Sequence, residues 1–301
     1  MNPSAFKYFS FITINENFES VDTLGTFALI TIVFLSVSRM IIYFIVIKFL
    51  ILKIKPRNYI LSFFLVAIIS IMNSMIFVGA NRASFILNFL ATIIILIYLY
   101  KKAAITFSFI MLALLPTLLG SLLNFRQTTT ITQGTNELID LTDTLQVYLG
   151  GVYNVAISLD ITSPNSNLLY LIIDIMRSAI GPSIFLKNIN FSNSVSLYNE
   201  RIFQSDLVSQ IIPMIGQGNL YLGYVFAPIL GVLFIYIATY FTKIIIEKSR
   251  FELIFVFTLI NGRLGFVMAQ NGNIFLNELT FYLPLFLIVY YFNNKVVIKN
   301  E

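Results

Sequence analysis

The sequence predicts an all-α integral membrane protein, and three observations support this. Of the 301 residues, 58% are hydrophobic and only 11% are charged, whereas a soluble domain carries about 25% charged residues. The mean hydropathy is +0.87. Long uncharged stretches alternate with short clusters of Lys and Arg, which is typical of a chain that crosses a lipid bilayer several times.

About seven segments are apolar enough to be membrane helices, which need roughly 20 residues to cross about 30 Å of hydrocarbon. The expected spans are 24–47, 58–79, 83–100, 103–124, 219–242, 251–270 and 276–292. We therefore expect a single membrane domain over residues 1–301. Residues 1–124 would form the first four helices, 125–218 one long loop, and 219–301 the last three helices.

The distribution of Lys and Arg predicts the orientation of these helices. Four basic clusters fall on one side of a seven-helix arrangement, and the positive-inside rule makes that side cytoplasmic. They comprise Lys48, Lys53, Lys55 and Arg57; Lys101 and Lys102; Lys243, Lys248 and Arg250; and Lys295 and Lys299. The expected location is the cytoplasmic membrane, with the N-terminus outside and the C-terminus inside. This asymmetry also accounts for the net charge of +5 without nucleic-acid binding.

The long loop, 125–218, is expected outside the cell and is not a simple linker. It contains seven acidic and four basic residues. Its segments "LQVYLGGVYNVAISL" and "NLLYLIIDIMRSAIG" are typical of short amphipathic helices that lie on the membrane surface or dip into it. "SPNSN" and "NINFSNS" are turn-rich breaks. The chain shows no convincing internal repeat, which disfavours transporter folds built from paired halves.

Five arginines are expected on or near the outer face, against the positive-inside trend: Arg82, Arg126, Arg177, Arg201 and Arg263. A guanidinium binds phosphate through two parallel hydrogen bonds and stays charged in a low dielectric. Each arginine taken singly could instead reach a lipid headgroup or pair with a nearby acid. The set favours an anionic ligand at the outer leaflet. Arg39, deep in the first helix, is expected to pair with a neighbouring helix.

The chain contains no His and no Cys, which limits its chemistry. Disulfides and histidine acid–base catalysis are excluded, a zinc site is very unlikely, and we expect neither metal nor cofactor. A general base must come from other residue types. The candidates in the loop are Asp160, Asp174, Glu200 and Asp206, although each could simply be a solvated charge.

Two further features leave alternatives open. Glu278 begins the last predicted helix and could form an ion pair with Arg263. The glycine-rich segment "IIPMIGQGNLYLGYVFAPILG" lacks the Lys-Ser/Thr of a nucleotide-binding loop. Its glycines allow close backbone approach, so it predicts either a re-entrant entry to a cavity or an ordinary junction between loop and helix.

These features together resemble a known family. "GANR" at the start of a helix, "YLGGVYNVAISL" in a long external loop and the glycine-rich segment are similar to the bacterial O-antigen and capsule repeat-unit polymerases, over about residues 70 to 290. The resemblance implies a GT-C-like membrane glycosyltransferase at the outer face of the cytoplasmic membrane. Its substrate would be an undecaprenyl-diphosphate-linked oligosaccharide, and a chain-length regulator protein could be a partner.

The same resemblance implies roles for particular arginines. Arg82 matches the family arginine at a helix edge, and Arg177 and Arg201 are candidates for the loop arginines that hold diphosphate. The chain departs from the family pattern because no Arg is followed by Gly eleven residues later. It also has fewer predicted helices, and it lacks the loop histidine of the related ligases.

Two other functions remain as alternatives. A flippase or exporter of lipid-linked oligosaccharides would also need basic residues, but would be expected to show internal symmetry and more helices. A structural or assembly protein would use its arginines only to anchor anionic lipids.

Overall fold

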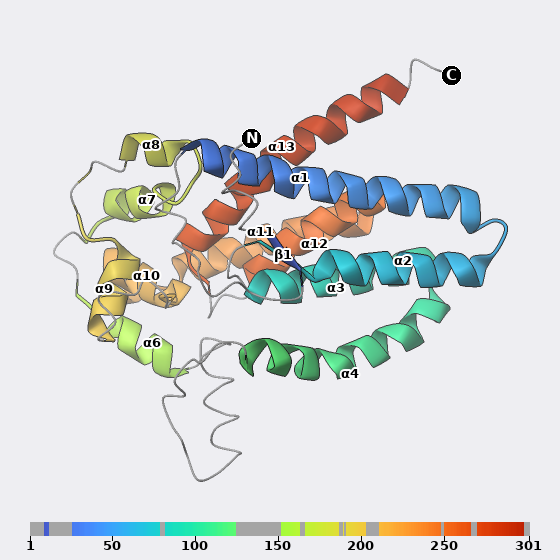
Figure 1. Cartoon of the computed structure of the whole chain (residues 1–301). Coiled ribbons are helices and arrows are strands. Elements are labelled where there is room, and N and C mark those ends of the chain that lie inside the picture. The colour runs from blue at the N-terminus through green and yellow to red at the C-terminus, as the bar shows by residue number, and fades with distance from the viewer. Residues whose placement is uncertain are drawn as a thin grey trace, which may run out of the picture. The chain divides into compact units, whose positions relative to one another are not determined.

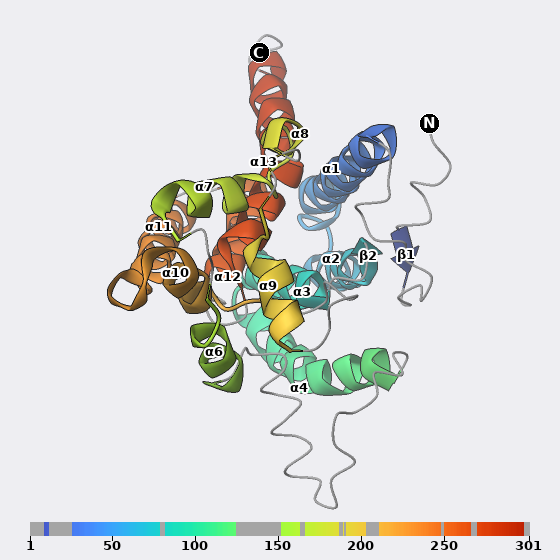
Figure 2. The same cartoon turned by 90° about the vertical axis from the view of Figure 1, so that its left-hand side faces the viewer.

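The structure of the chain is a computed structural model (Figures 1 and 2). It describes residues 9–11, 26–78, 82–124, 152–162, 166–186, 189, 191–202, 211–247, 250–265 and 270–297. The chain divides into two compact units. The first comprises Met1–Thr130, Ile245–Leu259 and Leu285–Glu301, and the second comprises Ile131–Ile244 and Ile260–Pro284.

Helices account for most of the described residues, which confirms the all-α prediction in its coarse form. The described residues contain one pair of short antiparallel strands, β1 (Phe9–Phe11) and β2 (Ile76–Val78), which lie in the first unit. Arg39 Nη1 donates a hydrogen bond of 2.9 Å to the carbonyl of Ile76. Arg39, expected to pair with a neighbouring helix, therefore contacts the backbone that follows α2 (Tyr59–Ser74).

Four long helices of the first unit lie close to their predicted positions. They are α1 (Thr26–Phe49), α2 (Tyr59–Ser74), α3 (Arg82–Tyr100) and α4 (Lys102–Asn124). A short π-helix, η3 (Leu50–Ile54), extends α1. Asn58 caps α2 by accepting a hydrogen bond of 2.9 Å from the backbone N–H of Leu61. Lys101, with a φ of 49°, forms the turn between α3 and α4.

Both apolar and hydroxyl contacts hold these helices together. Aromatic and aliphatic side chains from α3 and α4 form a buried core that includes Phe85, Phe89 and Met111. Ser74 Oγ lies 3.0 Å from Thr92 Oγ1, which joins α2 to α3. In lipid, apolar burial contributes little to helix association, so small polar residues between helices are favoured.

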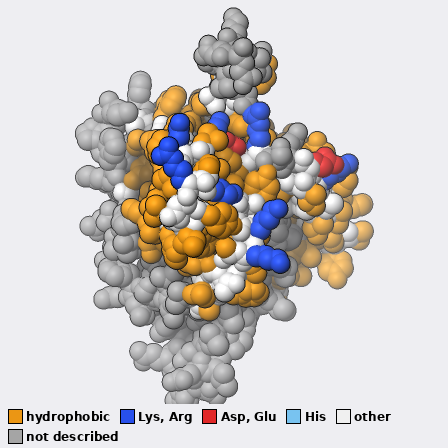
Figure 3. Space-filling model, turned by 90° about the vertical axis from the view of Figure 1, so that its right-hand side faces the viewer, with side chains coloured by type: hydrophobic (Ala, Val, Ile, Leu, Met, Phe, Trp, Pro, Cys, Tyr) orange, Lys and Arg blue, Asp and Glu red, His pale blue; other side chains and the backbone are white. Residues whose placement is uncertain are grey.

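Two of the predicted basic clusters lie at the same end of the first unit. Lys55 Nζ donates a hydrogen bond of 2.7 Å to the carbonyl of Leu99 and lies 4.8 Å from the centroid of the Tyr100 ring. The connection between α1 and α2 is therefore next to the turn that carries Lys101 and Lys102. Figure 3 shows Lys and Arg side chains gathered on this face. The inside orientation of this face stays a prediction.

The part of the predicted loop that the structure describes forms short helices of the second unit, the last of which continues past residue 218 (Figures 1 and 2). They are α6 (Val152–Leu159), α7 (Leu168–Met176), α8 (Pro182–Leu186), α9 (Ser194–Arg201) and α10 (Met214–Leu222). α10 contacts both α6 and α7, and α6 also contacts α9. Leu168, Leu169 and Ile172 on the outer face of α7 are exposed, consistent with an amphipathic helix.

The prediction of one helix over residues 219–242 is wrong. α10 ends at Leu222, and Gly223 follows with a φ of 77°. A short 3₁₀ turn, η4 (Tyr224–Phe226), leads through Pro228 into α11 (Ile229–Glu247). The left-handed backbone at Gly223 breaks the helical hydrogen-bond pattern, and proline has no N–H to donate at the start of the new helix.

The last two helices are α12 (Phe251–Gly265) and α13 (Gly272–Val297). The described part of α12 lies within the predicted 251–270, and α13 is longer than the predicted 276–292. Asn271 caps α13 by accepting a hydrogen bond of 2.9 Å from the backbone N–H of Ile274. This cap explains why the helix begins earlier than hydropathy alone indicates.

Three helices in the described part of the chain are long and apolar enough to cross a membrane. They cover Ile30–Ile54, Tyr224–Glu247 and Gly272–Asn293. The apolar helices Tyr59–Ser74, Phe85–Tyr100 and Lys102–Ala113 are shorter. The structure thus supports a membrane protein, while seven crossings stay a prediction.

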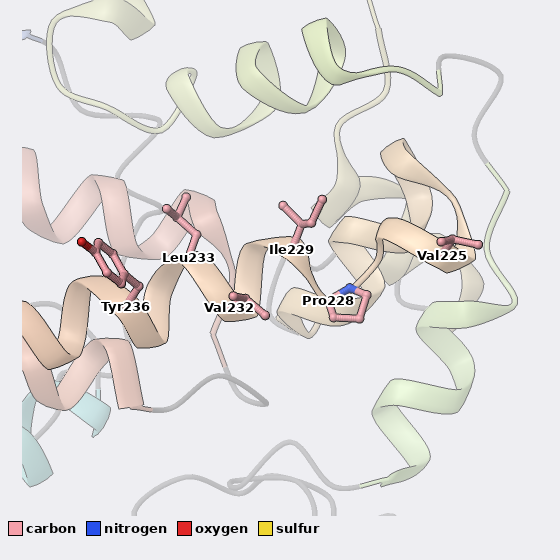
Figure 4. Close-up of a pocket in the computed structure, with 6 residues that line it drawn as sticks. All are labelled: Val225, Pro228, Ile229, Val232, Leu233 and Tyr236. Atoms are coloured by element: carbon pink, nitrogen blue, oxygen red, sulfur yellow. The ribbon is translucent and has the colours of Figure 1, made fainter.

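The beginning of α11 has an apolar outer face with a shallow groove of about 430 Å³ (Figure 4). Its lining comes from η4, α11 and the turn between them: Val225, Pro228, Ile229, Val232, Leu233 and Tyr236. Val225 is 80% exposed. Such a surface is expected to contact lipid.

Candidate functional site

Two predicted site residues form an ion pair in the second unit. Arg201 Nη2 donates to Asp160 Oδ2, although the two residues are 41 positions apart. Arg201 is the last residue of α9, and Asp160 immediately follows α6. Their side chains are 50% and 63% exposed, respectively. Solvent and ligands can therefore reach both groups.

The other predicted site residues have different surroundings. Glu200 is exposed and precedes Arg201 in α9, whereas Arg263 in α12 is only 4% exposed. Arg82 is the first residue of α3 in the first unit, and its side chain lies outside the described set. Arg126 and Asp206, together with the side chain of Glu278, also lie outside it.

Arg177 organises the chain that follows α7. Its Nε and Nη1 donate hydrogen bonds of 3.1 Å and 3.2 Å to the carbonyls of Leu186 and Phe191, and its Nη2 donates to the carbonyl of Ile189. The guanidinium carbon also lies 4.4 Å from the centroid of the Phe191 ring. Because these contacts use all three nitrogens, Arg177 is less available to a ligand than Arg201.

Asp174 is fully buried at the centre of the second unit. Its Oδ2 accepts hydrogen bonds of 2.5 Å from Ser194 Oγ and 3.0 Å from Gln217 Nε2. Asn273 Nδ2 donates to the Asp174 backbone carbonyl at 2.8 Å and lies 3.4 Å from Oδ1. These neutral donors come from α9, α10 and α13. We call Asp174, Ser194, Gln217 and Asn273 the Asp174 cluster.

Tyr221 adds a titratable group beside this cluster. Its hydroxyl is buried beside Asp174. Burial raises the pKa of the Tyr221 phenol, and the nearby negative charge of Asp174 raises it further. The phenol is therefore neutral at physiological pH and is not a base there.

The sequence did not identify three members of the Asp174 cluster: Ser194, Gln217 and Asn273. Each is a neutral residue, and the partners are 20 to 99 positions apart. A polar residue between two glycines, as in the "GQG" of residues 216–218, is the one local signal that could have drawn attention to Gln217.

The geometry distinguishes two kinds of polar site. The Asp174 cluster is enclosed and satisfied by neutral donors, so it is suited to holding helices together. The Asp160–Arg201 pair is open to solvent and presents a carboxylate beside a guanidinium. In the part of the chain that the structure describes, no three His, Cys, Asp or Glu side chains are arranged to share a metal ion.

Comparison of the chain with protein-family models, with curated proteins and with solved structures found no match.

Proposed function

We propose that the protein polymerises lipid-linked oligosaccharide repeat units into a surface polysaccharide at the outer face of the cytoplasmic membrane. The donor would be a glycan on undecaprenyl diphosphate, and the acceptor would be the next lipid-linked unit. The observation that carries this proposal is the exposed Asp160–Arg201 pair. The resemblance described above and the three long apolar helices support it.

The pair offers the two groups that this transfer needs. The acceptor hydroxyl oxygen attacks the anomeric carbon of the donor, and the bond from that carbon to the diphosphate oxygen breaks. Asp160 takes the hydroxyl proton as general base, which typically contributes 10²–10⁴-fold. Arg201 stabilises the negative charge that grows on the departing diphosphate, so it acts more strongly in the transition state than in the ground state.

Binding of the donor also frees the base. Before the substrate arrives, Asp160 is occupied by Arg201. A diphosphate binds a guanidinium through two parallel hydrogen bonds and competes with the single carboxylate. Once Arg201 turns to the diphosphate, the Asp160 carboxylate becomes available to the acceptor hydroxyl. Glu200 is the second candidate base because it neighbours Arg201 in α9.

The proposal can be tested by analysing the surface glycan of cells. Their only copy of this protein would carry Arg201→Gln or Asp160→Asn. Both variants are expected to lose long-chain polymer on gels, while single lipid-linked units accumulate at the outer face. Arg250→Gln is the matched control, because Arg250 is an exposed arginine of the first unit and its loss should leave the polymer unchanged. Normal polymer in both site variants would exclude the pair from catalysis.

Two further outcomes separate the alternatives. Single units stranded on the inner face would indicate a flippase or exporter. The charge exchange Asp160→Arg with Arg201→Asp preserves an ion pair but moves the base and the guanidinium. A pair that only holds α6 to α9 would regain function in that double variant, whereas a catalytic pair would not.

A further inference from the structure

α10 contacts α6, and its residues 216–219, "GQGN", make contacts both with α6 and with the first residue of α9. The proposed chemistry uses none of these four residues. We infer that they position the pair: they set where α6 ends and where α9 begins, and thereby hold Asp160 and Arg201 opposite each other. The positioning of the pair by α10 does not depend on the proposed function. Its effect on catalysis rests on that function.

On the α6 side, the contact is very close. A Cβ atom at Gly216 would lie 2.1 Å from Ser158 Oγ and 2.2 Å from Ser158 Cβ, so only glycine lets α10 approach here. Ser158 is fully buried and lies two residues before Asp160. One turn further along α10, Asn219 Nδ2 donates a hydrogen bond of 3.3 Å to the carbonyl of Leu159. These contacts fix the end of α6.

On the α9 side, Gln217 is the connector. Its Nε2 donates to Asp174 Oδ2 at 3.0 Å and lies 3.3 Å from Ser194 Oγ, while its Oε1 accepts a hydrogen bond of 2.9 Å from the backbone N–H of Gly272. Ser194 is the first residue of α9, and Arg201 is the last. At 1.5 Å per residue, the helix carries the position of Ser194 to Arg201 over about 10 Å.

The second glycine holds α10 itself in place. A Cβ at Gly218 would lie 2.1 Å from the backbone carbonyl oxygen of Ala227. The turn that leads into α11 therefore packs directly on the backbone of α10. Both neighbours of Gln217 must be glycine because a backbone or a buried side chain contacts each of them. This accounts for the glycine-rich segment as a close-packed centre of the second unit.

The absence of Cys from the chain gives a direct test. In membranes that contain the full chain with Asp160→Cys and Arg201→Cys, a short bifunctional maleimide should cross-link the two thiols. The ion pair is removed in this background, so the two positions are kept together by the α10 contacts and by the direct contact of α6 with α9. Adding Gln217→Ala or Asn219→Asp should eliminate most of the cross-linked product. Asn219→Asp keeps the size of the side chain and removes the N–H donor to Leu159.

Phe234→Leu is the matched control. Phe234 and Phe275 pack with ring centroids 4.7 Å apart, joining α11 to α13 in the same unit. This variant should lower stability while leaving cross-linking unchanged. Undiminished cross-linking in both α10 variants, or an equal loss in Phe234→Leu, would overturn the inference.

The two proposals can fail separately. If Gln217→Ala and Asn219→Asp reduce cross-linking but Asp160→Asn and Arg201→Gln cells make normal polymer, α10 positions the pair and the catalytic function is wrong. If those cells lose polymer while cross-linking is insensitive to α10, the pair is catalytic and something else positions it.

Discussion

Two carboxylates of the second unit lie in opposite environments. Asp174 is fully buried and accepts hydrogen bonds from three neutral side chains. Asp160 is 63% exposed and pairs with a guanidinium. The two acids are 14 residues apart in the chain, and the sequence alone made both of them candidate bases.

The difference shows how a single residue type can serve architecture or chemistry. Burying a carboxylate is costly unless several donors satisfy it, and a carboxylate enclosed by such donors cannot reach a substrate. An exposed ion pair contributes little to stability because water and salt screen it. Its groups can exchange partners at low cost, which suits them to binding and catalysis.

The largest expected effect is on stability at Asp174. Replacing Asp174 with Ala removes the Oδ2 acceptor of Ser194 and Gln217 from a buried site, whereas Asn273 keeps its bond to the backbone carbonyl of residue 174. At 1–3 kcal/mol for each of these two unsatisfied buried groups, the free energy of unfolding should fall by about 2 kcal/mol or more. Denaturant unfolding in detergent measures this, with Asp160→Ala as the exposed control. Equal stability of the two variants would contradict the contrast between the carboxylates.

A somewhat smaller loss is expected at Gly218, where α10 contacts the turn before α11. In Gly218→Ala the new methyl group would meet the Ala227 carbonyl at 2.1 Å, and backbone must move. Overpacking of this kind costs about 1–3 kcal/mol. Gly265→Ala is the control, because its Cβ has no atom within 4 Å among the described residues, and its stability should stay within about 0.5 kcal/mol of the parent.

These contrasts also show what the sequence could predict. Long apolar segments can be recognised from their composition, so α1 to α4 lie close to their predicted positions. The helix over residues 219–242 was misplaced because one left-handed glycine and one proline outweigh an uninterrupted apolar composition. Short loop helices at "VYNVAISL" and "NLLYLIID" were also predictable from their amphipathic pattern.

The contacts within the candidate site were not predictable for a different reason. Asp160 and Arg201 were both identified by residue type, but their pairing joins positions 41 residues apart. Neutral amides such as Gln217 and Asn273 have no distinctive pattern in a sequence. Asp174 and Asp160 look equivalent until folding buries one of them, because burial is set by the packing of whole helices.

The buried environment around Asp174 can also be tested at Tyr221, through the pH dependence of unfolding. Its raised phenol pKa means that ionisation is harder in the folded chain than in the unfolded chain. Below about pH 10 the phenol is neutral in both the folded and the unfolded chain, so its full contribution to the free energy of unfolding is present. Above it, the unfolded state loses a proton first, so stability falls by about 1.4 kcal/mol per pH unit until the folded pKa is reached. Tyr221→Phe should remove this part of the alkaline loss, as pH-dependent unfolding in detergent would measure.

Other tyrosines also ionise in this pH range, so the informative quantity is the difference between the parent and Tyr221→Phe. Tyr98→Phe is the control for removing a tyrosine hydroxyl, because Tyr98 is 42% exposed. Parallel slopes for the parent and Tyr221→Phe would show that the phenol is not held neutral by its surroundings.

The smallest expected effect on stability is at the Asp160–Arg201 pair. In a double-mutant cycle of Asp160→Asn and Arg201→Gln, unfolding should give a coupling of less than about 1 kcal/mol, and it should decrease as salt is added. The same single variants are expected to reduce polymer formation by about 10²–10⁴-fold if Asp160 is the base. A large loss of product with almost no loss of stability cannot come from unfolding, so it assigns the effect to the reaction. A coupling of several kcal/mol that salt does not reduce would instead show that this pair, like Asp174, has a structural role in the second unit.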